Sequence, residues 1–245
     1  MILSKIKQIM SENPSYGHRR IALALKLNKK RILRIMKKYN LKPYRRRRQK
    51  PQKLDDINKP STSYSNELKN FCPCVPHKAW VSDFTYISYR NRFIYLATIM
   101  DVFTRMILGW NVLSNHSTEL VKGAFEHAIK KTQKVPEILH SDQGSEYDSK
   151  EYTELLKSHN IIISMSKKAS PWENGFQESF YAGFKLDLGD PNRFNSLGEL
   201  IEEIFLSLNY YNKLRIHTKL KTTPLQFYLN YQNKFDSINT LEPVS

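Results

Sequence analysis

Residues 80–88 read Trp-Val-Ser-Asp-Phe-Thr-Tyr-Ile-Ser, and the stretches 93–100 and 105–113 that follow are equally rich in aromatic and β-branched residues. Residues of these types favour strands, and a short polar turn, Arg90-Asn91-Arg92, separates the first two stretches. Three strand-like stretches joined by short turns predict three consecutive antiparallel strands.

Helical and strand-like patterns alternate after these strands. The chain predicts, in order, a helix at 118–131, a strand at 137–140, a helix at 150–159 and a strand at 161–165. This order is typical of an α/β fold with a ribonuclease-H-like mixed sheet and flanking helices. In such a sheet the first strand is central, and Asp142 follows a strand beside it. We therefore expect Asp83 and Asp142 to lie together although they are far apart in the sequence.

Three carboxylates, Asp83, Asp142 and Glu178, each lie in a distinctive local sequence, within 80–86, 140–147 and 170–180 respectively. Acidic groups that converge need a counter-charge, and the usual one is a pair of divalent metal ions. Two ions roughly 3.5–4 Å apart can clamp the attacking and leaving oxygens of a phosphodiester. The three residues therefore indicate an enzyme that cuts and joins DNA.

The third carboxylate has two candidates. Ser170-Pro171-Trp172-Glu173 has the form of a capping box, which gives Glu173 a structural role. The aromatic residues Phe176, Phe180 and Phe184 predict the buried stripe of a helix. Glu178 lies about 200° around this helix from Phe176 and so points away from the stripe, on a face that also carries Tyr181 and Lys185. We prefer Glu178 as the ligand and keep Glu173 as the alternative.

The positive charge is concentrated in the N-terminal quarter. Residues 1–54 contain 18 of the 39 Lys and Arg residues but only one of the 23 acidic residues, Glu12. The net charge of +16 therefore belongs to this segment, and the rest of the chain is nearly neutral. A block this basic repels itself unless it meets a polyanion, of which nucleic acid is the commonest. The alternative is a solvated basic arm without a binding role.

Apolar residues recur at helical spacing through residues 1–43, and Asn28 is suited to cap the last helix. Cations lie between these apolar faces and in the run that follows. The pattern predicts a small basic all-α domain that binds DNA, followed by a basic segment that contacts phosphates. The candidate DNA contacts are Arg19, Arg20, Arg31, Arg34, Arg45, Arg46, Arg47 and Arg48.

Four parts follow from these patterns: a helical module at 1–43, a linker at 44–70, an α/β core at 71–190 and a helical extension at 191–245. Residues 55–70 of the linker are expected to be an exposed connector. The extension contains a second capping-box sequence, Ser196-Leu197-Gly198-Glu199, which predicts where its helix begins.

Cysteine content and hydropathy exclude several classes of protein. The two cysteines, Cys72 and Cys74, are too few for a disulfide framework and fit a reducing cytosol. A zinc site needs four ligands, and His77 is the only histidine near them. No apolar run approaches the length of a membrane span, and the N-terminus lacks a signal-peptide layout. We expect a cytoplasmic protein with no membrane partner.

The chain resembles the insertion-sequence family-three transposases of the OrfB type, whose catalytic domain is similar to retroviral integrase. The matching motifs occur in family order and span nearly the whole chain: 16–21, 31–41, 80–86, 95–110, 140–147, 178–185, 211–217 and 223–227. Within this resemblance the N-terminal module is helix-turn-helix-like.

The resemblance implies that Asp83, Asp142 and Glu178 form the acidic triad of a DDE-type polynucleotidyl transferase and bind two Mg²⁺ ions, with Mn²⁺ as a substitute. It implies DNA integration and recombination on double-stranded DNA (element ends and target), by a homo-oligomer associated with the prokaryotic nucleoid. Asp101 lies in a matching motif, and we expect it to tie a strand end to Arg105 or a backbone amide. Lys185 is expected to hold a phosphate or to be a solvated charge.

The chain departs from the family pattern before Glu178. It has Ala169 where Gly is common, and Trp172-Glu173-Asn174 where Tyr-Asp-Asn is common. Trp172 either stacks on a base or fills core. Family members often extend further upstream, and an upstream reading frame can supply another DNA-binding module as partner or fusion. One interpretation is that this chain is a shortened product.

Two other functions compete with transposition. An inactive remnant would act only as a DNA-binding protein, and the loss of an acidic residue would be its sign. None of the three is lost. A ribonuclease-H-type nuclease would cut without joining, but it would not need a separate basic domain.

Overall fold

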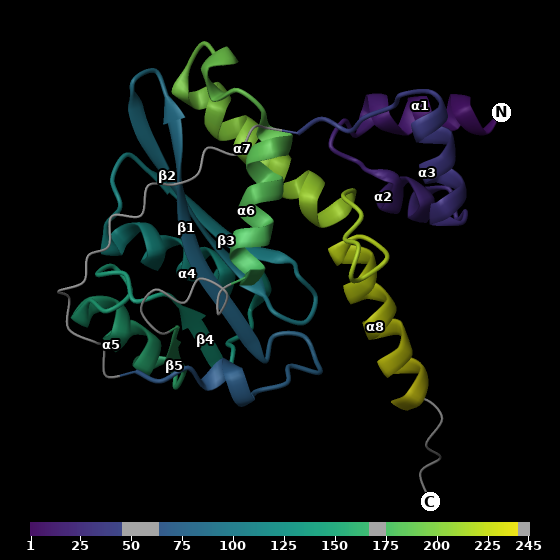
Figure 1. Ribbon diagram of the computed structural model, residues 1–245. Helices are drawn as coiled ribbons and strands as arrows, with labels where there is room; N and C mark the ends of the chain where they lie inside the picture. The colour runs from purple at the N-terminus through teal and green to yellow at the C-terminus, as the bar shows by residue number, and fades with distance from the viewer. Residues whose placement is uncertain (46–63, 167–174, 240–245) are drawn as a thin grey trace, which may run out of the picture. The chain divides into compact units, whose positions relative to one another are not determined.

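The structure is a computed structural model of the 245-residue chain and describes residues 1–45, 64–166 and 175–239. Figure 1 shows the chain as a ribbon, and its contacts define two compact units. The α/β unit consists of the described parts of 54–183 and 190–205, and the helical unit consists of those of 1–53, 184–189 and 206–245.

Five strands form the sheet of the α/β unit, in the order β3-β2-β1-β4-β5 (Figure 1). Their bounds are Ala79–Tyr89 (β1), Arg92–Asp101 (β2), Ile107–Leu113 (β3), Ile138–Ser141 (β4) and Ile162–Met165 (β5). Strands β1, β2 and β3 pair antiparallel, whereas β4 pairs parallel to both β1 and β5. The predicted meander, its central first strand and the ribonuclease-H-like fold class are confirmed.

Two helices, α4 (Thr118–Thr132) and α5 (Lys150–Ser158), pack with the sheet in one buried cluster. The rings of Trp80, Phe125, Tyr147 and Tyr152 fill its centre and are almost fully buried. Side chains of this size bury the most apolar surface per residue, so the cluster supplies much of the unit's stability.

Helix α4 lies very close to β3 at Gly109. A Cβ atom at this position would lie 2.3 Å from the carbonyl oxygen of Ala124 and 2.5 Å from the amide nitrogen of Ala128. Both neighbours are backbone atoms, so they cannot rotate away. Only glycine permits this spacing.

Replacing Gly109 by Ala should therefore lower the free energy of unfolding by about 1–3 kcal/mol, the usual cost of overpacking. Gly198 provides the control, because a Cβ atom there meets nothing nearer than 3.7 Å and the residue lies in a helix. Gly198→Ala should leave stability unchanged or raise it slightly. Urea denaturation of both variants measures the difference, and equal effects would contradict the packing argument.

Residues 64–69 lie against the edge strand β5. The Met165 amide donates to the Ser65 carbonyl at 3.1 Å, and the Glu67 amide donates to Ser164 Oγ at 2.9 Å. Tyr64 packs against the main cluster. This part of the expected exposed connector is therefore attached to the sheet, where it covers a strand edge that would otherwise be open. Residues 46–63 lie outside the described residues.

Three helices form the N-terminal part of the helical unit: α1 (Ile2–Glu12), α2 (His18–Ala24) and α3 (Lys29–Lys38). Ile6, Ile21 and Ile32 are completely buried between them. The predicted cap of α3 is confirmed, because Asn28 Oδ1 accepts a hydrogen bond from the Lys30 amide at 2.8 Å.

Among the described residues, three α-helices follow β5: α6 (Gly175–Leu188), α7 (Leu197–Lys213) and α8 (Pro224–Asn239). The predicted serine cap of α7 is present, whereas the reciprocal bond of Glu199 goes to Asn195, the residue before the cap. Ser196 Oγ accepts from the Glu199 amide at 3.1 Å, and Glu199 Oε2 accepts from the amide of Asn195 at 2.9 Å. No helix among the described residues is long and apolar enough to cross a membrane.

Chain segments from both ends of the sequence meet in the core of the helical unit. The Ile216 amide donates to Tyr16 Oη at 2.7 Å, and Arg20 Nε donates to the Ile216 carbonyl at 2.9 Å. Tyr210 Oη donates to Asn13 Oδ1 at 2.5 Å. The segment around Ile216 is therefore fixed against the N-terminal helices, in a region that the sequence treats as two separate parts.

Candidate active site

Asp83 lies within β1, and Asp142 directly follows β4. The two strands pair in parallel with Val81 opposite His140, so the same register places Asp83 opposite Asp142 just beyond the ladder. The pKa of the buried Tyr147 phenol is raised by burial and then by the negative charges of both aspartates. Both carboxylates therefore lie near one phenol, and the adjacency expected from the strand order is present.

Asp142 is held in a turn that carries a second acidic residue. Its Oδ1 accepts from the Gly144 amide at 3.0 Å. Burial and, secondarily, the charge of Glu146 raise the pKa of Asp142, while the Gly144 amide opposes this rise. A Cβ atom on Gly144 would lie 3.0 Å from Glu146 Oε2 and 3.1 Å from Asp142 Oδ1, so the glycine admits both carboxylates. Negative charge accumulates here.

Glu146 was not singled out from the sequence. It is 7% exposed and pairs with His116 Nδ1 at 2.5 Å. The His116 ring stacks on Phe84, with an angle of 6° between the planes. The pair thus connects the loop after β3 with the loop after β4, next to Asp83. The only sequence signal was the position of Glu146 in the same motif as Asp142.

Two polar residues anchor helix α6 to the sheet beside Asp83. Gln177 is completely buried, and its Nε2 donates to the Val81 carbonyl at 2.8 Å while its Oε1 accepts from Thr98 Oγ1 at 3.1 Å. Tyr181 Oη donates to the Asp83 carbonyl at 2.6 Å. The backbone that carries Asp83 is therefore bonded to α6 directly.

The predicted orientation of α6 is confirmed for Phe180 and Phe184, which are buried, and is wrong for two other residues. Tyr181 was expected on the exposed face and is buried, whereas Phe176 was expected in the buried stripe and is only partly buried, under the Arg105 guanidinium at 3.8 Å. Apolar spacing alone misses an anchor whose polar atoms are matched by backbone carbonyls.

Glu178 follows Gln177 in the first turn of α6 and is exposed. Among the residues that the structure describes, no three acidic, His or Cys side chains lie close enough to share one ion. Glu178 is therefore not grouped with Asp83 and Asp142. The alternative ligand Glu173 lies outside the described residues, as do Ala169 and Trp172.

Asp101 has the structural role expected for it. Its Oδ2 accepts from the His77 amide at 2.7 Å, and its Oδ1 accepts from the Thr104 amide at 2.6 Å. These bonds close the turn between β2 and β3 and attach it to the start of β1. A carboxylate with both oxygens used in this way is poorly placed to bind a metal ion.

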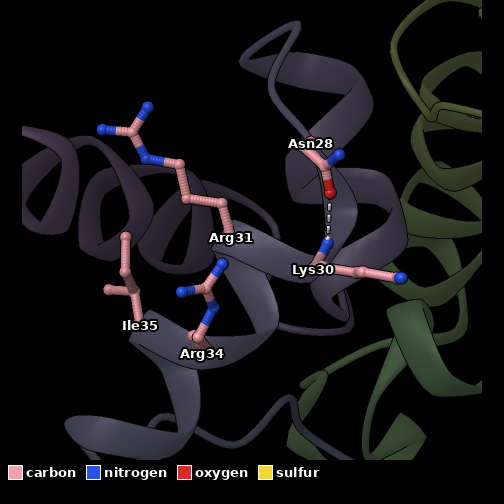
Figure 2. Close-up of a pocket in the computed structure, with 5 residues that line it drawn as sticks. All are labelled: Asn28, Lys30, Arg31, Arg34 and Ile35. Atoms are coloured by element: carbon pink, nitrogen blue, oxygen red, sulfur yellow. Dashed lines mark hydrogen bonds between the residues drawn. The ribbon is translucent and has the colours of Figure 1, made fainter.

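The predicted DNA contacts differ in where they lie. Arg31 and Arg34 line a hollow on α3 with Asn28, Lys30 and Ile35, and Figure 2 shows both arginines along the helix. Arg19 and Arg45 are exposed, whereas Arg46, Arg47 and Arg48 lie outside the described residues. The one correction is Arg20. Its Nε donates a hydrogen bond to the Ile216 carbonyl, and its guanidinium lies 5.5 Å from the centre of the Tyr16 ring. Burial and the positive charge of Arg215 lower its pKa. We remove it from the candidate contacts.

Comparison with known proteins identifies the fold. Residues 75–171 and 159–224 match the integrase core domain family. The HTLV-2 integrase catalytic core domain, solved with magnesium, has a TM-score of 0.53 at 22% identity and aligns with 63% of this chain and 98% of its own. A chain of the simian T-cell lymphotropic virus intasome has a TM-score of 0.57 at 18% identity, covering 91% and 74%. The chain is thus a protein with an integrase-type core.

Two similar transposases show to which family of integrase-core proteins the chain belongs. The transposase for insertion sequence IS904 of Lactococcus lactis is 33% identical over an alignment of 237 residues that covers 90% of this chain and 90% of the relative. The putative transposase InsK for IS150 of Escherichia coli is 28% identical over 234 residues, covering 92% of this chain and 82% of the relative. The chain belongs to the insertion-sequence transposases with an integrase core domain, as the sequence motifs indicated.

Proposed function

We propose that this chain catalyses DNA strand cleavage and strand transfer for an insertion sequence, with Asp83, Asp142 and Glu178 as the ligands of two divalent ions. The observation that carries the proposal is the parallel register of β1 and β4, which places two of the three carboxylates side by side. The substrate would be double-stranded DNA bound by a homo-oligomer at the nucleoid. Family membership supports this choice.

The residues fit a hard cation. Carboxylate oxygens are the ligands that Mg²⁺ and Mn²⁺ prefer. Asp142 is partly buried with Glu146 nearby, and both circumstances raise its pKa. Two like charges about 4 Å apart repel by roughly 4 kcal/mol at an effective dielectric constant of about 20, and a divalent cation removes this cost. When bound, such ions polarise the attacking and leaving oxygens of a phosphodiester.

In this proposal the protein's own residues position the metal ligands and do not attack the phosphodiester. The Gly144 amide orients the Asp142 carboxylate, and Gln177 and Tyr181 hold α6 against β1. Nearby hydroxyls serve local hydrogen bonds: Ser141 Oγ donates to the Asp142 carbonyl, and Ser82 Oγ is bonded to Tyr147 Oη. We assign no protein nucleophile, since water or a DNA 3′-hydroxyl would attack.

The test is a Mn²⁺-dependent assay with a labelled 3′-hydroxyl oligonucleotide and supercoiled plasmid, scoring joined product, nicks and bound DNA separately. Joined product supports the proposal. Nicks without joining would favour the nuclease, and DNA binding with neither activity would favour the inactive remnant.

Glu146→Gln should extend this activity to lower pH. A protonated Asp142 cannot bind a cation, so activity falls as pH decreases through its raised pKa. Glu146 contributes to that rise, and its neutral replacement lowers the pKa of Asp142. The acidic limb of the pH–rate profile should therefore move to lower pH. Glu151→Gln, at an exposed pair with Lys122, is the control. If the acidic limb of the profile lies at the same pH in Glu146→Gln and Glu151→Gln, Glu146 does not raise the pKa of Asp142.

A further inference from the structure

The helical unit contains a groove of about 920 Å³, and Arg19 is the only one of its lining residues among the DNA contacts predicted above. It is lined by α2, by the turn into α3, by the start of α3 and by residues 218–221 from the C-terminal part of the chain. Six of its lining residues are cations: Arg19, Lys26, Lys29, Lys30, Lys219 and Lys221. None of its lining residues is acidic. In the part of the chain that the structure describes, no carboxylate pairs with any of the six.

The C-terminal cations are held in place by a short hairpin. The His217 amide donates to the Thr222 carbonyl at 2.9 Å, and the Lys221 amide donates to the His217 carbonyl at 2.8 Å. The backbone of the preceding residue, Ile216, is hydrogen-bonded to the side chains of Tyr16 and Arg20 in the N-terminal part of the unit. Lys219 and Lys221 are therefore built into the same unit as α2 and α3 and face the same groove.

Two of the lysines occupy backbone positions that disfavour a side chain. Lys26 has a φ of +52° and Lys221 has a φ of +61°, in the left-handed region where glycine and asparagine are preferred. Asparagine tolerates this backbone region and can therefore replace the lysine at either turn without added strain.

The groove adjoins the hollow that holds Arg31 and Arg34. Asn28 and Lys30 line both, so cations of the hairpin and of α3 line neighbouring hollows. Figure 2 shows Lys30, Arg31 and Arg34 on the α3 side. A single small anion would need two or three of these charges. A band of eight cations instead matches a ligand with regularly repeated negative charges, which is the backbone of nucleic acid.

We propose that this groove binds the phosphate backbone of duplex DNA, so that the hairpin at 217–222 completes the DNA-binding surface of the N-terminal helices. The proposal rests on the proposed function for its ligand. Contacts of this kind orient a protein on DNA without reading its sequence.

The test is the salt dependence of binding to a short DNA duplex of arbitrary sequence. The groove variant combines Lys219→Gln with Lys221→Asn, and asparagine accepts the left-handed backbone at position 221, so the fold is retained. The slope of log affinity against log salt concentration should become about two units less steep, roughly 0.9 for each lost phosphate contact.

The matched control combines Lys213→Gln with Lys234→Gln, which removes the same charge from exposed positions on α7 and α8. Its slope should stay close to that of the wild type. Equal slopes for the two double variants, or wild-type binding by the groove variant, would overturn the proposal.

Separate measurements of DNA binding and of DNA joining distinguish the groove proposal from the proposed strand-transfer activity. If the wild type joins no DNA but the groove variant still shows the reduced slope, the groove stands and the proposed activity fails. If the wild type joins DNA and the slope is unchanged in the groove variant, the activity stands and the groove assignment fails.

Discussion

Replacing Asp142 by Asn should reduce strand transfer by about 10³-fold or more, because a lost metal ligand removes several kcal/mol of transition-state stabilisation. The same variant should be more stable than the wild type without metal. Burial and Glu146 raise the pKa of Asp142, which means that its charged form is disfavoured in the folded state. At neutral pH a neutral amide avoids this cost.

Thermal unfolding with and without Mn²⁺ measures the expected change in stability, and the joining assay measures the loss of strand transfer. In the presence of a chelator, the unfolding midpoint should be higher for Asp142→Asn than for the wild type. Adding Mn²⁺ should raise the unfolding midpoint of the wild type more than that of Asp142→Asn. Asp148→Asn, an exposed position in the same loop, should behave as the wild type does. A variant that is both inactive and less stable in chelator would show that Asp142 has a structural role instead.

Replacing Asp187 by Ala should destabilise the helical unit by about 3–5 kcal/mol. Arg215 Nε donates to Asp187 Oδ2 at 2.5 Å, and the two side chains are only 6% and 14% exposed. Arg20, whose pKa is lowered by burial and by Arg215, lies in the same cluster of charges. Without the carboxylate, two cations would remain in a poorly solvated site.

Urea denaturation, followed with a probe in the helical unit, checks this prediction. The double variant Asp187→Leu with Arg215→Met should recover much of the loss, because it leaves no unpaired buried charge. Glu151→Ala removes an exposed ion pair and should change nothing measurable. Similar results for the buried and the exposed pair would contradict the argument from burial.

The sequence was sufficient for the α/β sheet because its signals are local. Strand-like stretches, short turns and helical spacing determined β1 to β5, and the strand order then placed Asp83 beside Asp142. The cap of α3 and the start of α7 were likewise predicted, since caps depend on residues within one turn.

The sequence was insufficient where distant segments meet. Gln177 and Tyr181 were missed because their polar groups are satisfied by carbonyls of β1 and β2, which no local pattern reveals. Arg20 looked like a DNA contact, but its partner is the carbonyl of Ile216 near the other end of the chain. The cations of the groove were visible individually, and only the fold brings them together.

In our proposal Asp83, Asp142 and Glu178 act as one metal-binding set, and Glu178 is its least constrained member. The most direct measurement compares Mn²⁺-dependent joining by the wild type, Glu178→Gln and Glu173→Gln. We predict joined product from the wild type and Glu173→Gln and none from Glu178→Gln. Joining by Glu178→Gln, with its loss in Glu173→Gln, would contradict the assignment.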